Sequence, residues 1–162
     1  MNIQPTPRKN LRLKNYDYTQ QGLYFITICI NDRGKYFGDI TNHILTLNNV
    51  GKMIAQSWLE LENQFPFIGF HEYIIMPNHF HGIIEIKDQS PIHLGDIIGA
   101  FKSITTNHYI KGVHEKEWQS FEKRFWQRNY YEHVIRDEKS YLKLSEYIQN
   151  NPLKWEDDKF YM

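Results

Sequence analysis

Two strand-like segments separated only by Pro77 and Asn78 constrain this chain more than any other feature of its sequence. The first segment reads GFHEYIIM and the second reads HFHGIIEIK, and both are rich in the β-branched and aromatic residues that favour strands. So short a connection joins strands that run antiparallel. The sequence therefore predicts a β-hairpin over residues 69–87.

Hydrophobic spacing predicts further strands and helices on both sides of this hairpin. The expected elements are strands at residues 23–31 and 43–48 and helices at residues 48–65, 94–110 and 137–150. The first helix has an asparagine N-cap, and the last begins at Asp137. The aromatic stretch 118–136 fits neither pattern. In this order the elements predict an α+β fold with helices packed on an antiparallel sheet.

Length and composition favour one globular domain. Apolar residues make up 41% of the 162 residues, and no repeat or Pro/Gly/Ser-rich linker divides them. We therefore expect a single domain over residues 1–162 that starts with a basic arm, residues 1–22. The chain has no run of about 18 apolar residues, and its start lacks the apolar core of a secretory signal. These absences predict a cytoplasmic protein without a membrane span. The single cysteine, Cys29, excludes an intramolecular disulfide.

The formal net charge is zero, which argues against binding of nucleic acid by bulk charge alone. The basic residues are nevertheless concentrated. Residues 1–16 contain no acid and four basic residues, Arg8, Lys9, Arg12 and Lys14. Residues 97–114 also lack acids, whereas acids gather in the tail at 156–158. Local basic surfaces can contact phosphates, although charge alone favours ordinary solvated faces.

The triplet His79-Phe80-His81 carries the most chemical information. Side chains alternate along a strand, so residues i and i+2 share a face roughly 7 Å apart. Both imidazoles are therefore expected to point one way and Phe80 the other. Two imidazoles so placed can chelate one divalent ion. On spacing alone, surface or hydrogen-bonded histidines are the commoner case.

Tyr147 and Asn151 form a second pair, in the helix-ending run EYIQNNP. Positions i and i+4 lie on one helical face, about one turn apart. An asparagine oxygen there could complete a metal site beside a tyrosine hydroxyl. Spacing alone favours a simpler interpretation, in which Tyr147 packs on the core and Asn151 caps the helix before Pro152.

Three ordered motifs, MPNHFHGII, FWQRNYYEHVIR and SEYIQNNPLKW, resemble the single-tyrosine HUH transposases, in particular the REP-associated tyrosine transposases of bacteria. The likeness extends from YFITI to NPLKW and so spans nearly the whole chain. HUH denotes two histidines flanking a hydrophobic residue. The resemblance implies an RRM-like (ferredoxin-like) antiparallel sheet with helices packed on one side.

The resemblance also implies roles for particular residues. His79 and His81 match the metal-binding histidines, and Tyr147 matches the nucleophile that stands before an asparagine–proline pair. Asn151 falls where this class places a third metal ligand, although the neighbouring Asn150 competes for that role. Of the other tyrosines that follow the histidines, Tyr109 is expected to pack in the core or to face DNA, whereas Tyr130 and Tyr131 are expected mostly to serve structural packing.

Members of this class act on hairpin-forming single-stranded DNA, as monomers or as homodimers. The resemblance therefore implies a nucleoid-associated transposase that cleaves and rejoins DNA strands through a 5′-phosphotyrosine. A tyrosine hydroxyl with its ordinary pKa near 10 is a poor nucleophile at neutral pH. A divalent metal, Mg²⁺ or Mn²⁺, would stabilise the charge that builds on the phosphate. DNA contacts are expected from Arg8, Lys9, Arg12, Lys14, Lys102 and Arg128.

Three alternatives stay open. A regulator with the same fold could bind DNA without mobilising it. A metal-dependent hydrolase could combine the histidines with Glu72 or Glu85 and would not need Tyr147, although Glu85 would lie far along the strand from a shared ion. An RRM-type RNA-binding module ranks last, because the sequence lacks the aromatic strand consensus of such modules.

Overall fold

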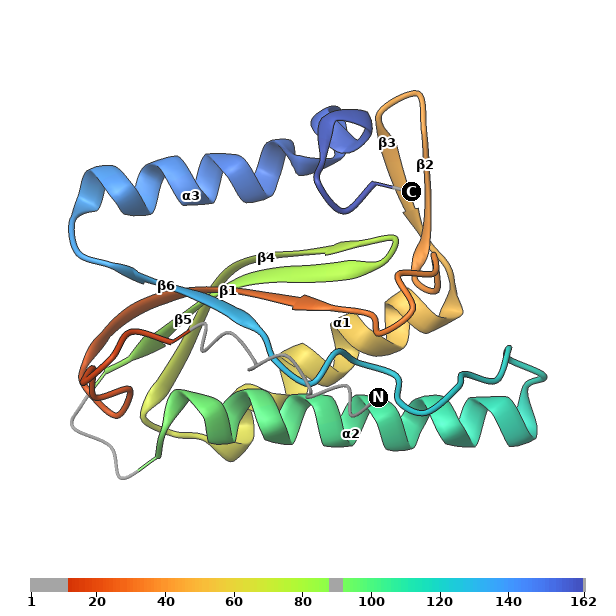
Figure 1. Cartoon of the computed structure of the whole chain (residues 1–162), viewed down its shortest axis with the longest axis horizontal. Helices are drawn as coiled ribbons and strands as arrows, with labels where there is room; N and C mark the ends of the chain where they lie inside the picture. The colour runs from red at the N-terminus through yellow and green to blue at the C-terminus, as the bar shows by residue number, and fades with distance from the viewer. Residues whose placement is uncertain (1–11, 88–91, 162) are drawn as a thin grey trace, which may run out of the picture.

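A four-stranded antiparallel sheet, with strand order β4-β5-β1-β6, forms the centre of the computed structural model, which describes residues 12–87 and 92–161 (Figure 1). Its strands are β1 (Gly22–Cys29), β4 (Ile68–Met76), β5 (His79–Ile86) and β6 (Tyr131–Ile135). The predicted hairpin is confirmed, because β4 and β5 pair antiparallel across Pro77 and Asn78.

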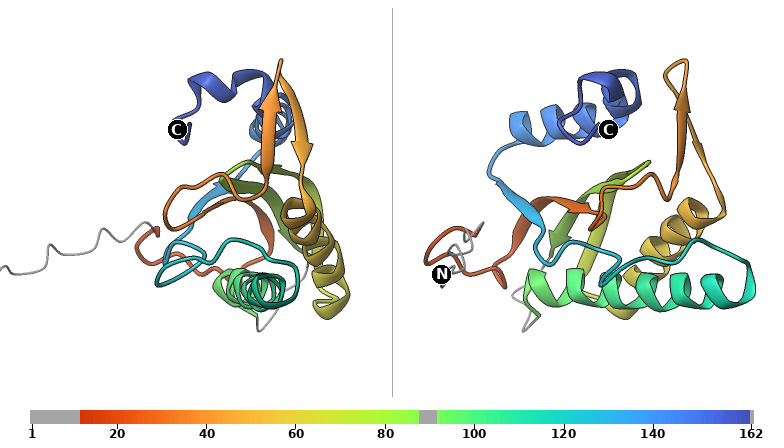
Figure 2. Two further views of the ribbon diagram at one scale, coloured as in Figure 1. Left: turned by 90° about the vertical axis from the view of Figure 1, so that its right-hand side faces the viewer. Right: turned by 45° about the vertical axis from the view of Figure 1, so that its right-hand side comes forward.

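Helices join these strands in a simple order. The helical elements are α1 (Asn49–Leu61), η1 (Glu62–Gln64), α2 (Leu94–Glu115), α3 (Glu138–Asn150) and η2 (Asn151–Asp157). The order β1-α1-β4-β5-α2-β6 is the ferredoxin-like βαββαβ arrangement, which confirms the α+β class. A small hairpin of β2 (Gly38–Thr41) and β3 (Ile44–Leu47) is inserted before α1 and projects from the body (Figure 2).

The two faces of the sheet are covered by different helices. On one face, Phe80 packs against Trp58 of α1 and Phe101 of α2, with ring centroids 4.6 and 5.3 Å apart. On the other face, Ile83 packs with Ile148 of α3. The expected packing of helices on one side of the sheet therefore holds for α1 and α2, whereas α3 lies across the opposite face (Figure 1). The reason is that β5 is buried on both faces, so each face requires a cover.

Local signals set most element boundaries. Asn48 caps α1 by accepting a 2.9 Å hydrogen bond from Gly51 N, and Asp137 caps α3 by accepting one of 2.7 Å from Ser140 N. Both caps were predicted. The second helix runs further than expected, to Glu115, and the unassigned stretch 118–136 contains β6. No helix among residues 12–87 and 92–161 is long and apolar enough to cross a membrane.

Candidate active site

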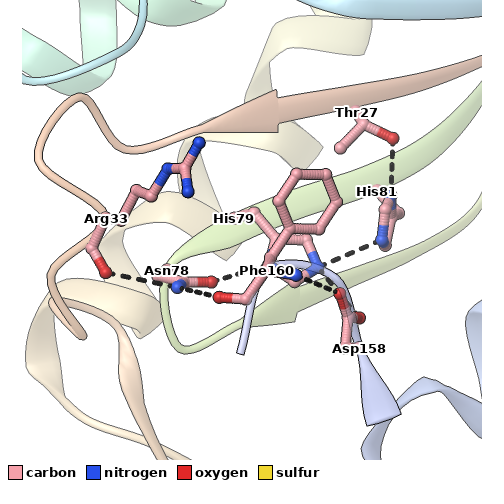
Figure 3. Close-up of polar contacts among 7 residues, drawn as sticks. All are labelled: Thr27, Arg33, Asn78, His79, His81, Asp158 and Phe160. Carbon is pink, nitrogen blue, oxygen red and sulfur yellow. Dashed lines mark hydrogen bonds and ion pairs between the residues drawn. The ribbon is translucent and has the colours of Figure 1, made fainter. Parts of the chain in front are cut away.

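Strand β5 places His79 and His81 together on the face that α3 covers (Figure 3). Their side chains are 0% and 1% exposed. The two Nε2 atoms lie 3.1 Å apart, and the rings meet nearly edge to face at 74°. Two buried imidazoles thus direct one nitrogen each toward a common point, as the spacing of the triplet predicted.

The outer nitrogens of both rings are held by neighbouring side chains (Figure 3). Thr27 lies opposite His81 in the β1–β5 ladder, and its Oγ1 is 2.8 Å from Nδ1 of His81. Asn78 Oδ1 lies 2.8 Å from Nδ1 of His79. Such outer partners fix the ring orientation of metal-binding histidines. The sequence pattern predicted no role for Thr27 or Asn78.

The hydrogen bonds of Asn78 also define the tautomer of His79. The Asn78 amide nitrogen donates to the carbonyl oxygens of Arg33 at 3.2 Å and Phe160 at 2.7 Å. Its Oδ1 must then accept, so the Nδ1–H of His79 donates to it. A neutral imidazole with its proton on Nδ1 has a lone pair on Nε2. His79 therefore presents an electron pair to the centre of the site.

A carboxylate completes this cluster. Asp158, which follows η2, has a side chain that is only 5% exposed, and its Oδ2 lies 3.8 Å from Nε2 of His79. The ligand atoms of His79, His81 and Asp158 lie within 4.8 Å of one another. Two nitrogens and a carboxylate oxygen form a donor set suited to a divalent transition metal. In the sequence, Asp158 is distinguished only as one of the acids of the tail.

The C-terminal segment lies directly over the histidines. The Phe160 ring packs on His79 with centroids 4.6 Å apart, and its main-chain nitrogen donates a 2.8 Å hydrogen bond to Asp158 Oδ1. Trp155 stacks on His79 from η2, at 6.0 Å and 26°. These contacts explain why the His79 imidazole is removed from solvent.

Helix α3 brings Tyr147 and Asn151 to the same place. The Tyr147 ring is 38% exposed and lies 5.4 Å from the His81 ring and 6.0 Å from the Phe25 ring. Asn151, one turn later, is 2% exposed, and no described residue donates a hydrogen bond to its Oδ1. A buried oxygen without a donor is costly unless a cation or water satisfies it.

The family of the chain follows from comparison with known proteins. Residues 20–151 match the family described as "Transposase IS200 like". The chain belongs to this transposase family. A putative REP-associated tyrosine transposase of Haemophilus influenzae is 29% identical, over 88% of this chain and 77% of the relative. An uncharacterized protein of the same bacterium is 42% identical, over 96% of this chain and 93% of the relative.

Solved structures of transposases share the fold of this family member. A REP-associated tyrosine transposase bound to a REP hairpin superposes with a TM-score of 0.66 and 21% identity, over 88% of this chain and 73% of the other. A putative transposase from Deinococcus radiodurans gives a TM-score of 0.52 and 15% identity, over 86% of this chain and 97% of the other.

Burial governs the protonation of the candidate active site in this transposase-family protein. It lowers the pKa of His81 to about 3 and that of His79 well below its ordinary value, so both rings are neutral at pH 7. Burial also raises the pKa of the Tyr147 hydroxyl, while a hydrogen bond from the Asn151 side chain acts in the opposite direction. Burial likewise raises the pKa of Asp158. Without an added positive charge, Tyr147 is therefore a neutral phenol.

The acids of the alternative hydrolase site lie elsewhere. Glu85 is 2.8 Å from His71 Nε2, and Glu72 accepts a 2.8 Å hydrogen bond from Tyr141. Among the described residues, the metal-compatible cluster contains Asp158 and neither glutamate.

The predicted DNA-binding residues occupy different surroundings. Arg8 and Lys9 lie outside the described residues, and Lys14 is exposed. The Arg12 guanidinium lies 5.1 Å from the centre of the Tyr130 ring. Lys102 donates a 2.9 Å hydrogen bond to the Gln127 carbonyl, which ties its ammonium to the main chain. Arg128 is exposed.

Proposed function

We propose that this transposase-family protein cleaves and rejoins single-stranded DNA, with Tyr147 as the nucleophile and His79 and His81 as metal ligands. The placement of the Tyr147 ring 5.4 Å from His81 supports this proposal most directly. It sets a hydroxyl-bearing side chain beside two imidazoles whose inner nitrogens converge.

In the proposed reaction, each bond to phosphorus that breaks is replaced by one that forms. The reaction therefore needs no nucleotide cofactor. Tyr147 Oη forms a bond to the phosphorus as the bond from phosphorus to the 3′ oxygen breaks. The phenol loses its proton and the leaving 3′ oxygen gains one, giving a 5′-phosphotyrosine and a free 3′ hydroxyl. An incoming 3′ hydroxyl then reverses these steps and joins a new strand while releasing Tyr147.

The donor set fits a divalent metal. His79 and His81 would hold it through Nε2, and the unpartnered Asn151 oxygen and the Asp158 carboxylate are the candidates for an oxygen ligand. Two nitrogens with oxygens suit Mn²⁺, and Mg²⁺ gains further oxygen ligands from the phosphate. A bound cation would supply the positive charge that stabilises the phosphate oxygens during attack. Because His79 is buried and the Phe160 ring packs on it, we expect Phe160 to move when a phosphate approaches His79.

We further propose hairpin-forming DNA as the substrate. The supporting observation is the likeness to the REP-associated transposase that was solved with a REP hairpin. A single domain over residues 1–162, acting in the bacterial cytoplasm as a monomer or homodimer, would suffice for this activity.

The test is a covalent-adduct assay with a DNA hairpin that carries a single-stranded flank, with Mn²⁺, Mg²⁺ or chelator. The wild-type chain should give a metal-dependent protein–DNA band with a 5′ linkage. Tyr147→Phe should remove the band, whereas Tyr141→Phe, a matched change on the same helix, should retain it. Binding without any adduct would favour the non-mobilising regulator. Cleavage that survives Tyr147→Phe would favour the hydrolase.

A further inference from the structure

A basic groove lies between α2 and the segment 121–128, away from the candidate active site. Its volume is about 560 Å³. Four cationic residues line it, namely Lys102, Lys123, Arg124 and Arg128, and no acidic residue lies among the described lining residues. The chain as a whole has equal numbers of basic and acidic residues, 19 of each. The groove is therefore a local concentration of positive charge that attracts anions.

One wall of the groove is a polar face of α2. Ser103, Thr106 and Asn107 line the groove, together with Ile110. The spacing i, i+3, i+4 and i+7 puts all four on one helical face. Hydroxyl and amide side chains next to arginine and lysine are the usual donors to phosphate oxygens in protein–DNA complexes.

The other wall is held in place by hydrogen bonds to α2. Lys102 Nζ donates to the carbonyls of Gln127, Arg128 and Asn129 at 2.9, 3.3 and 3.3 Å. Trp126 Nε1 donates to Thr105 Oγ1 at 2.9 Å. Lys102 is thus a positioning residue for this wall, and the groove is formed before any ligand binds.

The other cationic residues of the groove are exposed, unlike Lys102, which positions the wall. Lys123, Arg124 and Arg128 are exposed. The neighbouring aromatic rings of Phe125 and Trp126 are only 2% and 4% exposed. Single-stranded nucleic acid is usually held by exposed aromatic rings that stack on bases. Phe121 also lines the groove, but it is half-buried, with its ring 5.8 Å from that of Tyr109 and 5.5 Å from that of Phe125. Cations and short polar groups with no fully exposed ring are suited to the backbone of a duplex instead.

The groove is connected to the candidate active site through β1. Gln127 N donates a 2.9 Å hydrogen bond to the Cys29 carbonyl, and Cys29 is the register partner of His79. The groove wall and His79 are therefore two strand spacings apart, roughly 10 Å. Figure 1 shows the segment between α2 and β6 returning along α2 to this edge of the sheet.

We propose that this groove binds the phosphate backbone of the base-paired stem of a DNA hairpin, so that the adjoining single strand reaches Tyr147. This inference rests on the proposed function for its substrate class. It adds Lys123 and Arg124 to the predicted contact residue Arg128.

The experiment measures fluorescence anisotropy of the full chain with a stem-loop DNA and with an unpaired strand of equal length. Arg124→Ala/Arg128→Ala should weaken stem-loop binding by about tenfold or more and reduce the salt-dependence slope by about 2. Binding of the unpaired strand should change by less than about twofold. The matched control, Lys52→Ala/Lys87→Ala, removes two exposed lysines outside the groove and should behave as wild type.

Further outcomes test the groove, and the last of them separates this inference from the proposed function. Arg124→Lys/Arg128→Lys should retain the salt slope, because it retains the charge. Equal losses in the alanine and control variants, or equal losses for both DNAs, would overturn the groove as a stem site. If the wild type forms no adduct but its stem binding depends on Arg124 and Arg128, the groove stands and the proposed catalytic function fails.

Discussion

Asn78 fixes the orientation of His79 through a 2.8 Å hydrogen bond between Asn78 Oδ1 and His79 Nδ1. The same amide donates to the Phe160 carbonyl and so also joins the C-terminal segment to the site. One side chain thereby controls both the lone pair that faces the metal position and the segment that covers it.

Asn78→Ala should weaken Mn²⁺ binding about 10- to 100-fold, because His79 loses the acceptor that fixes its tautomer. Isothermal titration calorimetry of the free protein measures this change. Asn78→Asp keeps an acceptor for His79 but loses both amide donors, so it should bind Mn²⁺ at least as tightly as wild type. If both variants bind Mn²⁺ equally weakly, the effect would instead come from the lost hydrogen bond to the Phe160 carbonyl in the C-terminal segment.

Asp158→Ala should reduce the Mn²⁺ affinity of the free protein about tenfold or more, because it removes the carboxylate of the described cluster. Asn151→Ala should reduce it less, since an amide oxygen carries no net charge. Manganese titration of both variants by electron paramagnetic resonance measures the difference. A larger loss of Mn²⁺ affinity in Asn151→Ala than in Asp158→Ala would identify Asn151 as the third ligand, as the family resemblance implies. Asp158 would then not be a ligand.

Metal-free protein should become less stable as the pH falls from 7 to 5. Burial lowers the pKa of His81 to about 3, whereas the unfolded chain regains the ordinary value near 6.5. Between these values the unfolded state binds the proton that the folded state excludes, so stability rises with pH. His81 alone should account for about 2 kcal/mol of unfolding free energy over this range.

Urea unfolding in the presence of chelator tests this pH dependence. His81→Gln should show a smaller loss of stability between pH 7 and 5 than wild type. His114→Gln, which changes an exposed histidine, should keep the full loss. An unchanged pH dependence in His81→Gln would contradict the burial argument.

Two glycines of α2 should respond in opposite directions to alanine. A Cβ at Gly112 would lie 2.0 Å from a ring carbon of Trp118, so Gly112→Ala should destabilise the chain by about 1 kcal/mol or more. A Cβ at Gly99 meets nothing within 4 Å, so Gly99→Ala should stabilise it by about 0.5–1 kcal/mol. Thermal melts of both variants give the comparison, and a stabilised Gly112→Ala would show that Trp118 moves aside freely.

Features that depend on local spacing could be predicted from the sequence. The β4–β5 hairpin follows from the short connection at Pro77 and Asn78. The shared face of His79 and His81 and the opposite direction of Phe80 follow from strand alternation. The proximity of Tyr147 to these histidines could not be derived in this way, because it depends on the docking of α3. The expectation that Tyr147 acts together with His79 and His81 came from the family resemblance.

Other features were missed for definable physical reasons. Strand β6 lies at the sheet edge with mostly exposed or half-buried residues, so its hydrophobic alternation is weak. The backbone is non-helical at Lys154, inside η2, and Asp158 comes directly after η2. Asp158 lies at the site beside Phe160, which packs on His79. Neither the kink nor this long-range contact has a local sequence signal.

Helix α3 buries fewer of its residues than α2 does. Two of its residues, Ser145 and Ile148, are buried, whereas α2 buries seven. Segments with few buried contacts open at lower free energy than the rest of a domain. Mild heating would therefore displace the helix that carries Tyr147 while the sheet, α1 and α2 stay folded. With Tyr147 as the proposed nucleophile, we expect DNA cleavage to be lost on heating before the rest of the domain melts.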